Sequence, residues 1–284
     1  MDISNVFIRF PGGRAKALTL SYDDGVQEDI RLVEIMQKHG LRGTFNLNTG
    51  KYITEEEAAQ STKQYGIRLT KEQATELYSK DGVEPALHGL THPFMAQLAR
   101  PQLNYEVLKD RENLEDQFGK VVRGLAYPYG SYSDAAVEVL RDCGVIYART
   151  TRSTERFDIP TDWLRMPATC HHKNPRLPEL TEQFIERDPK HNENAWLFYL
   201  WGHTFEFPRD NNWDVIETFA EKVGGRDDVW YATNGELYEY VESFRALVFS
   251  LDCKHVENPT AQSVWFTFRG QLYEVGAGKT LTLA

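Results

Sequence analysis

Residues 17–47 read ALTLSYDDGVQEDIRLVEIMQKHGLRGTFNL, and this stretch decides the fold. Its apolar start, residues 17–22, predicts a buried strand. Residues 29–39 follow with helical spacing of apolar side chains and with Gly40 at the end, where glycine commonly terminates a helix. Residues 44–47 then predict a second strand. A strand, a helix and a strand in this order indicate two parallel strands joined by a crossover helix.

The same alternation continues along the chain. Further strands are expected at residues 85–87, 121–126, 145–148, 164–166, 196–201 and 229–232, and helices at 70–78, 101–118, 133–143, 179–187, 213–223 and 234–246. Seven or eight parallel strands favour a closed, distorted (β/α) barrel over an open sheet. The last segments, 263–268, 271–275 and 280–283, alternate like short antiparallel strands. We therefore expect an α/β fold with a barrel domain over residues 1–246 and a C-terminal β extension, residues 247–284, packed on it.

Composition excludes several classes of protein. The 284 residues are 41% hydrophobic and 26% charged, which is ordinary for a folded domain and excludes a disordered chain. The net charge of −10 disfavours nucleic acid and anionic membrane surfaces as partners. Three widely spaced cysteines indicate free thiols. Because neither a secretory leader nor a long apolar run is present, the expected location is cytoplasmic.

Reactive side chains follow the expected strands. Asp23 and Asp24 come at the end of the first strand, His88 and His92 after the third, and His203 after the seventh. In a (β/α) barrel, the loops that follow the strands open on one face of the molecule, where active sites are built. These side chains are therefore expected to converge.

The histidine pair suggests a metal site. His88 and His92 are four residues apart, so both imidazoles share a face if the segment turns helically. A zincin protease is disfavoured, because Gly89 occupies the place of its glutamate base and Pro93 biases His92 away from a continuing helix.

Adjacent carboxylates complete the expected chemistry. An Asp-Asp-Gly sequence alone is typical of a solvated turn, but neighbouring side chains leave a strand in different directions. One of Asp23 and Asp24 can therefore bind a cation while the other faces a substrate. Two histidines and one carboxylate leave a divalent ion with open positions, as in catalytic zinc sites. Water bound there ionises near pH 7, the second carboxylate can take its proton, and His203 can protonate a leaving amine.

Taken in order, these segments resemble the motifs of the polysaccharide deacetylase family, also called the NodB-type family or carbohydrate esterase family four. The first two, T-F-D-D-G and H-[ST]-x-x-H, are similar to Ser21-Tyr22-Asp23-Asp24-Gly25 and His88-Gly89-Leu90-Thr91-His92. The third motif, R-x-P-[YF], is similar to Ala126-Tyr127-Pro128-Tyr129-Gly130. The fourth motif contains an Asp-Trp pair, which is similar to Asp162-Trp163, and the fifth, L-x-x-H, is similar to Leu200-Trp201-Gly202-His203. The resemblance spans residues 21–203.

This resemblance implies a TIM-like barrel and a metal-dependent hydrolase of carbohydrate metabolism that removes N-acetyl groups from an amino sugar or its oligomers. It implies that Asp24, His88 and His92 bind one divalent ion, with zinc favoured and cobalt, nickel or manganese also acceptable to such ligands. It also implies that Asp23 is the base that activates the metal-bound water, that His203 is the acid, and that the backbone N–H of Tyr129 stabilises the oxyanion.

One residue departs from the family pattern. Ala126 stands where the third motif has the arginine that orients the base aspartate. Arg123 and Arg165 are the candidates to replace it. Asp162, which would pair with that arginine, is therefore a weaker counterpart of the family residue.

Other residues near the expected mouth allow two interpretations. Cys170, His171 and His172 look like a ligand cluster, but neighbours on an extended segment point in opposite directions and cannot readily bind one ion. His171 and His172 either contact substrate at the rim or pack structurally. Trp201 belongs to the core or forms an apolar wall for an acetyl methyl or a sugar face. Glu206 and Trp213, after the seventh strand, either reach the mouth or face solvent.

Two further functions remain open at this point. The same fold and metal would also suit a small non-sugar amide or a cyclic ureide, which an acidic chain without a leader motivates. A carbohydrate-binding protein with a degenerate site is the other alternative, which Ala126 motivates. The sequence does not indicate the oligomeric state.

Overall fold

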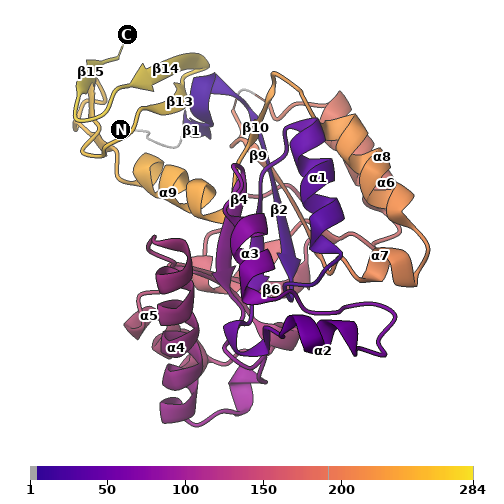
Figure 1. Cartoon of the computed structure of the whole chain (residues 1–284). Helices are drawn as coiled ribbons and strands as arrows, with labels where there is room; N and C mark the ends of the chain where they lie inside the picture. The colour runs from indigo at the N-terminus through magenta and orange to yellow at the C-terminus, as the bar shows by residue number, and fades with distance from the viewer. Residues whose placement is uncertain (1–4, 191, 284) are drawn as a thin grey trace.

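A parallel sheet, wrapped by helices, forms the centre of the molecule (Figure 1). The computed structural model describes residues 5–190 and 192–283. The parallel strands are β2 (Lys16–Asp23), β3 (Gly43–Leu47), β4 (Val83–Leu87), β5 (Gly124–Ala126), β6 (Tyr147–Ser153), β7 (Met166–Ala168), β8 (Cys170–His171), β9 (Trp196–Gly202) and β10 (Val229–Tyr231). The helices are α1 (Asp29–His39), α2 (Glu55–Ala59), α3 (Lys71–Tyr78), α4 (Arg100–Phe118), α5 (Asp134–Asp142), α6 (Leu177–Glu186), α7 (Glu206–Arg209), α8 (Trp213–Val223) and α9 (Asn234–Arg245).

The two ends of the sheet are brought together by one short segment of chain, residues 166–171. Its strand order is β7-β6-β5-β4-β3-β2-β9-β8, so β7 and β8 lie at the two ends. These two strands are nearly contiguous in the chain: β7 pairs with β6 and β8 pairs with β9, both in parallel. Strand β10 pairs only with residues 16–18 of β2, beside the part of β2 that pairs with β3. The prediction of a distorted barrel is therefore confirmed.

Local sequence explains the helix boundaries near the site. Helix α1 buries Leu32, Val33 and Met36 against the sheet and ends at Gly40, whose φ of 66° suits glycine. Helix α3 begins with the expected capping box between Thr70 and Gln73, an arrangement that contributes about 1 kcal/mol. These helices hold the loops that follow β2 and β3.

Two expected strands have different bounds. The segment expected at 164–166 is mostly a 3-10 turn, Trp163–Arg165, because the Asp162 carboxylate accepts a hydrogen bond from the Leu164 N–H and bends the chain. Strand β6 extends to Ser153, well beyond the expected end at residue 148. Consequently Arg149 lies inside a strand.

The C-terminal segment forms two small antiparallel sheets, as expected from its alternation. One contains β13 (Val264–Phe268) and β14 (Gln271–Val275), and the other contains β11 (Val248–Phe249), β12 (His255–Glu257) and β15 (Thr280–Thr282). The first sheet also includes β1 (Val6–Arg9), which pairs with β13 and which the sequence did not predict. Figure 1 shows this β extension beside α9 at one end of the barrel. The domain boundary at residue 246 stays a prediction. No described helix is both long and apolar enough to cross a membrane.

Candidate active site

The carboxyl ends of β2 and β4 bring three metal-binding side chains together. Asp24 follows β2, and His88 and His92 follow β4. One potential ligand atom from each of the three lies within 4.8 Å of the others. The carboxylate of Asp24 and the Nε2 atom of His92 are 3.6 Å apart. This trio is the set that the sequence predicts as metal ligands.

His88 is held in the tautomer that a metal ligand needs. Its Nδ1 atom lies 2.8 Å from the carbonyl oxygen of Ala126, so Nδ1–H donates there and Nε2 is left with a free lone pair. Burial lowers the pKa of His88 and keeps the ring neutral. Asn48 donates to the carbonyl oxygens of His88 and Gly89, at 2.6 Å and 2.7 Å, which fixes the backbone of the ligand loop.

Asp24 and His92 also have the charge states of ligands. Burial opposes the charged form of Asp24, but the Arg68 guanidinium, 2.8 Å away, and nearby imidazoles lower its pKa overall. Burial and the neighbouring His88 lower the pKa of His92 to about 4. At neutral pH the trio therefore consists of one carboxylate and two neutral imidazoles, which fits a divalent ion such as zinc.

The backbone is strained at three of the predicted site residues. Among the described residues, seven non-glycine residues have positive φ, and they include Asp24 at 89°, His92 at 62° and Tyr129 at 57°. Such conformations cost roughly 1–3 kcal/mol each and cluster at functional sites. The His88 and His92 rings therefore meet across a tight turn, with centroids 4.8 Å apart, and not along a helix. This agrees with the presence of Pro93, which biases His92 away from a helical conformation.

Asp23 lies beside the trio as a buried, ionised carboxylate. It is only 2% exposed and accepts hydrogen bonds from Asn46, at 2.8 Å, and from Arg149. Its Oδ2 atom lies 3.8 Å from the Nε2 atoms of both His88 and His203. Burial opposes its charge, but Arg149 and the two imidazoles hold its pKa at about 2.

The arginine that holds Asp23 is neither of the two candidates from the sequence. Arg123 forms an ion pair with Glu239, and Arg165 forms ion pairs with Asp134 and Asp162. These contacts direct both guanidinium groups to the surface. Arg149 takes the place instead, from β6, where its Cα is the register partner of Ala126 on β5.

His203 faces Asp23 from the end of β9. Its Nδ1 atom lies 3.4 Å from the carboxylate of Glu206 on α7, so Nε2 is the nitrogen directed toward Asp23. Burial opposes a charge on His203, but Glu206, Asp23 and Asp24 raise its pKa overall. Glu206 itself is ionised because, although it is partly buried, the surrounding imidazoles hold its pKa well below the usual range. Glu206 thus reaches the site, as one of its two interpretations proposed.

A second group, His171, His203 and Glu206, has ligand atoms equally close together but does not fit a metal. The Nδ1 atom of His171 accepts a hydrogen bond from the Lys173 N–H at 3.1 Å. With Nδ1 accepting, Nε2 carries a proton; it lies 3.1 Å from the Glu206 carboxylate and donates to it. His88 has the opposite tautomer, with Nδ1 bonded to the Ala126 carbonyl oxygen and a free lone pair on Nε2.

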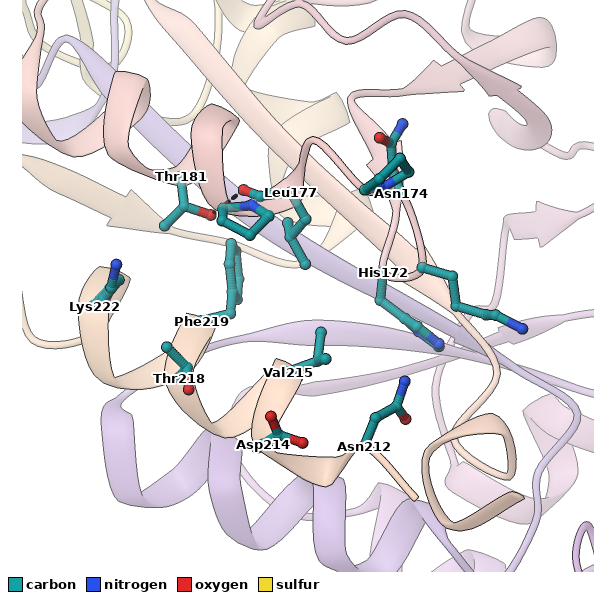
Figure 2. Close-up of a pocket in the computed structure, with 13 residues that line it drawn as sticks. His172, Asn174, Leu177, Thr181, Asn212, Asp214, Val215, Thr218, Phe219 and Lys222 are labelled. Atoms are coloured by element: carbon teal, nitrogen blue, oxygen red, sulfur yellow. Dashed lines mark hydrogen bonds between the residues drawn. The ribbon is translucent and has the colours of Figure 1, made fainter. Parts of the chain in front are cut away.

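His172 is buried behind Glu206, and its Nε2 atom lies 3.3 Å from the Glu206 carboxylate. Its ring is 1% exposed and stacks on Phe207 and Tyr22, with centroid distances of 4.3 Å and 5.8 Å. A cavity of about 430 Å³ lies between α6 and α8, and its lining includes none of the predicted metal ligands. Figure 2 shows His172 among the residues that line it. Packing is therefore its role in this structure, and of the two histidines only the half-buried His171 is available to a substrate.

The remaining predicted residues have clear positions. Cys170 is buried, which raises the pKa of its thiol to about 12. The Arg149 guanidinium lies over the Trp201 ring, 4.2 Å from the ring centre. Contact between Trp201 and substrate stays a prediction. Trp163 donates to Glu242. Trp213 packs on Phe207, at a centroid distance of 4.9 Å, outside the site.

Tyr129 forms an exposed aromatic edge beside the trio. Its side chain is 58% exposed and stacks on Phe94, with a centroid distance of 4.0 Å and an angle of 11° between the rings. The other neighbour is His92, whose ring meets Tyr129 edge-on at 4.4 Å. The proposed role of the Tyr129 N–H stays a prediction.

Sequence reasoning missed four polar residues that hold the site. Arg149 follows an expected strand directly, which was the available signal. Asn46 and Asn48 come at the end of another expected strand. Arg68, which joins Asp24 to Asn48, comes from a loop that no pattern marked.

Comparison with known proteins bears on the family and the fold. The model of the polysaccharide deacetylase family matches residues 11–148, which contain the trio, Asp23 and Tyr129 and end before Arg149 and His203. Over this segment the chain matches the polysaccharide deacetylase family.

Individual relatives are distant. A candidate polysaccharide deacetylase from Mycobacterium smegmatis has a TM-score of 0.58 at 16% identity, over 84% of this chain and 94% of that one, and so shares the fold. A pseudoenzyme of carbohydrate esterase family 4 from Bacillus anthracis is similar at a TM-score of 0.49 and 17% identity, over 82% and 68%. The uncharacterized protein YlxY of Bacillus subtilis is 27% identical over 109 residues, which span 38% of this chain and only 29% of that protein.

Proposed function

We propose that this protein is a divalent-metal-dependent deacetylase that hydrolyses the N-acetyl group of an amino sugar or its oligomers. One observation carries the proposal. A trio of ligand character, Asp24, His88 and His92, lies next to an ionised carboxylate, Asp23, which in turn faces His203. Amide hydrolysis needs these groups: an electrophile, a base and an acid.

The first step requires a base and a way to hold it. A divalent ion bound by Asp24, His88 and His92 would supply Lewis acidity and acidify water at the site. Asp23 accepts the proton of the attacking water. Arg149 and Asn46 hold its carboxylate in one orientation, so its position is fixed before the reaction begins.

The second step requires an acid at the leaving nitrogen. His203 is suited to this role because its pKa is raised and its Nε2 atom faces the same space as Asp23. Glu206 stabilises the charged imidazolium through Nδ1. The N–H of Tyr129, at the tight turn after β5, is the donor proposed for the developing oxyanion.

The exposed aromatic edge favours a carbohydrate over a small ureide. Phe94 and Tyr129, which are 46% and 58% exposed, offer apolar surface immediately beside His92. An extended sugar can use such a surface, whereas a small polar ureide would leave it in water. The position of Arg149 weighs against a degenerate binding protein, because the base aspartate keeps a guanidinium partner despite Ala126.

Acetate release from N-acetylglucosamine oligomers tests the proposal. Protein stripped with a chelator should be inactive and should recover when zinc, cobalt or manganese is added. Asp23→Asn and His88→Ala should lose at least 100-fold in kcat, while His255→Ala, on exposed β12, should match the unchanged protein. Equal rates for His88→Ala and the unchanged protein would contradict the proposal. Turnover of a cyclic ureide such as allantoin, without any acetate release, would favour the small-amide alternative.

A further inference from the structure

Two buried carboxylates outside the reacting set flank the site. Asp29 is the first residue of α1 and Asp110 lies in α4; each is 0% exposed. Among the described residues neither forms an ion pair, and burial raises the pKa of each to about 7. Since a buried carboxylate without a cation is costly, its hydrogen bonds must matter to the fold or the site.

Asp29 joins three segments that meet behind the acid. Its Oδ2 atom accepts hydrogen bonds from the Val26 N–H, at 3.2 Å, and from the Tyr78 hydroxyl, at 2.6 Å. Its Oδ1 atom accepts a hydrogen bond from the hydroxyl of Thr204, which is 0% exposed. Val26 lies two residues after Asp24, and Thr204 directly follows His203. Asp29 therefore fixes the loop of the acid relative to the loop that follows Asp23 and carries Asp24.

Asp110 makes an equivalent set of bonds on the opposite side. Its Oδ1 atom accepts from the N–H and the hydroxyl of Thr49, at 2.9 Å and 2.7 Å. Its Oδ2 atom accepts from the His88 N–H at 3.2 Å. Thr49 follows Asn48, which binds the carbonyl oxygens of His88 and Gly89. Asp110 therefore fixes the loop that presents His88, and none of these three bonds reaches the acid loop.

We propose that Asp29 and Asp110 are separate positioning residues, Asp29 for the proposed acid His203 and Asp110 for the metal ligand His88. The inference rests on the proposed function for the roles of these two histidines. It goes beyond that function by assigning each half of the site its own buried anchor. The two anchors are matched in burial and in the number of accepted bonds, so each is a control for the other.

Two readouts that need no catalysis test the proposal. The first is zinc affinity, measured by competition with a chromogenic chelator. The second is backbone hydrogen exchange of peptides that cover residues 200–212. Asp110→Asn should weaken zinc binding 10- to 100-fold, as expected when a group that orients a ligand is altered, and should leave this exchange unchanged. Asp29→Asn should speed this exchange at least tenfold and weaken zinc binding clearly less than Asp110→Asn does, since it contacts the loop of Asp24 only through the Val26 N–H.

Milder variants guard against loss of folding. Thr204→Val removes one donor to Asp29, and Thr49→Val removes one donor to Asp110; each should reproduce the effect of its partner on a smaller scale. If deacetylation is measurable, Asp29→Asn and Thr204→Val should lower kcat with little change in KM. The proposal would be overturned if the Asp29 and Thr204 variants weakened zinc binding as much as the Asp110 and Thr49 variants do. It would also be overturned if neither zinc affinity nor hydrogen exchange changed in any of them. Absence of deacetylation by the unchanged protein would instead refute the proposed function, because both binding and exchange are measured without substrate.

Discussion

Ala126 and Arg149 are register partners on the neighbouring parallel strands β5 and β6, and both side chains are buried. Adjacent strands are about 4.8 Å apart, and side chains at paired positions project to the same face of a sheet. An arginine on either strand can therefore enter the same part of the interior. This relationship explains how Asp23 keeps a guanidinium partner although the expected position holds alanine.

Removing Arg149 should damage both stability and activity. Arg149→Met leaves the buried Asp23 carboxylate without its cation, which costs about 3–5 kcal/mol in the free energy of unfolding. We also expect at least a 100-fold loss in kcat, because Asp23 loses its fixed orientation. Urea unfolding and acetate release measure the two effects. Arg165→Met, which breaks exposed ion pairs, should cost less than about 1 kcal/mol; a similarly small cost for Arg149→Met would contradict the assignment.

Returning the arginine to β5 should rescue the site in part. Arg149→Ala should lose stability, and the double variant Ala126→Arg with Arg149→Ala should recover at least half of that loss in free energy of unfolding. Ala126→Arg alone should be destabilised by about 1–3 kcal/mol, because a second large side chain overfills the interior. A double variant that is no more stable than the sum of its single changes would show that the two strands are not interchangeable.

Glu206 should set the alkaline limit of activity. It raises the pKa of His203, so its removal in Glu206→Gln should lower that pKa. If His203 must be protonated to act as the acid, the high-pH limb of kcat then moves to lower pH. A pH profile of acetate release measures the shift. The exposed Glu182→Gln should leave the profile unchanged, and an unmoved high-pH limb in Glu206→Gln would separate Glu206 from the acid.

His172 should make the metal-free protein less stable in acid. Burial lowers its pKa to about 3, whereas a histidine in an unfolded chain titrates near about 6.5. Between these values the unfolded chain binds a proton that the folded chain does not, so stability falls as pH falls, by up to about 1.4 kcal/mol per pH unit. His172→Phe should therefore lose less stability than the unchanged protein between pH 7 and pH 5. Urea unfolding with a chelator present measures this, and parallel pH dependences would contradict it.

The fold was largely predictable because its strands and helices carry local signals. The apolar run of β2, the glycine after α1 and the capping box of α3 each depend on a few neighbouring residues. Strand β1 was not predictable in this way. It is four residues long, and its partner, β13, lies at the other end of the chain.

The site residues likewise divide into those marked by local sequence motifs and those placed by contacts between distant segments. Asp24, His88 and His92 stand in motifs whose spacing is visible in the sequence. Arg149 was missed because its function depends on the register between β5 and β6, which no local pattern reports. Arg68 and Asp110 were missed because they reach the metal ligands from loops and helices distant in sequence.

The pairing of β1 with β13 has a consequence for biosynthesis. Val6 aligns with Phe268, so during synthesis β1 must wait for its partner until β13 has been made. Until then β1 lacks its strand partner and presents an open edge on that side. Completion of this small sheet therefore follows the synthesis of the catalytic loops, which lie between β1 and β13 in the sequence.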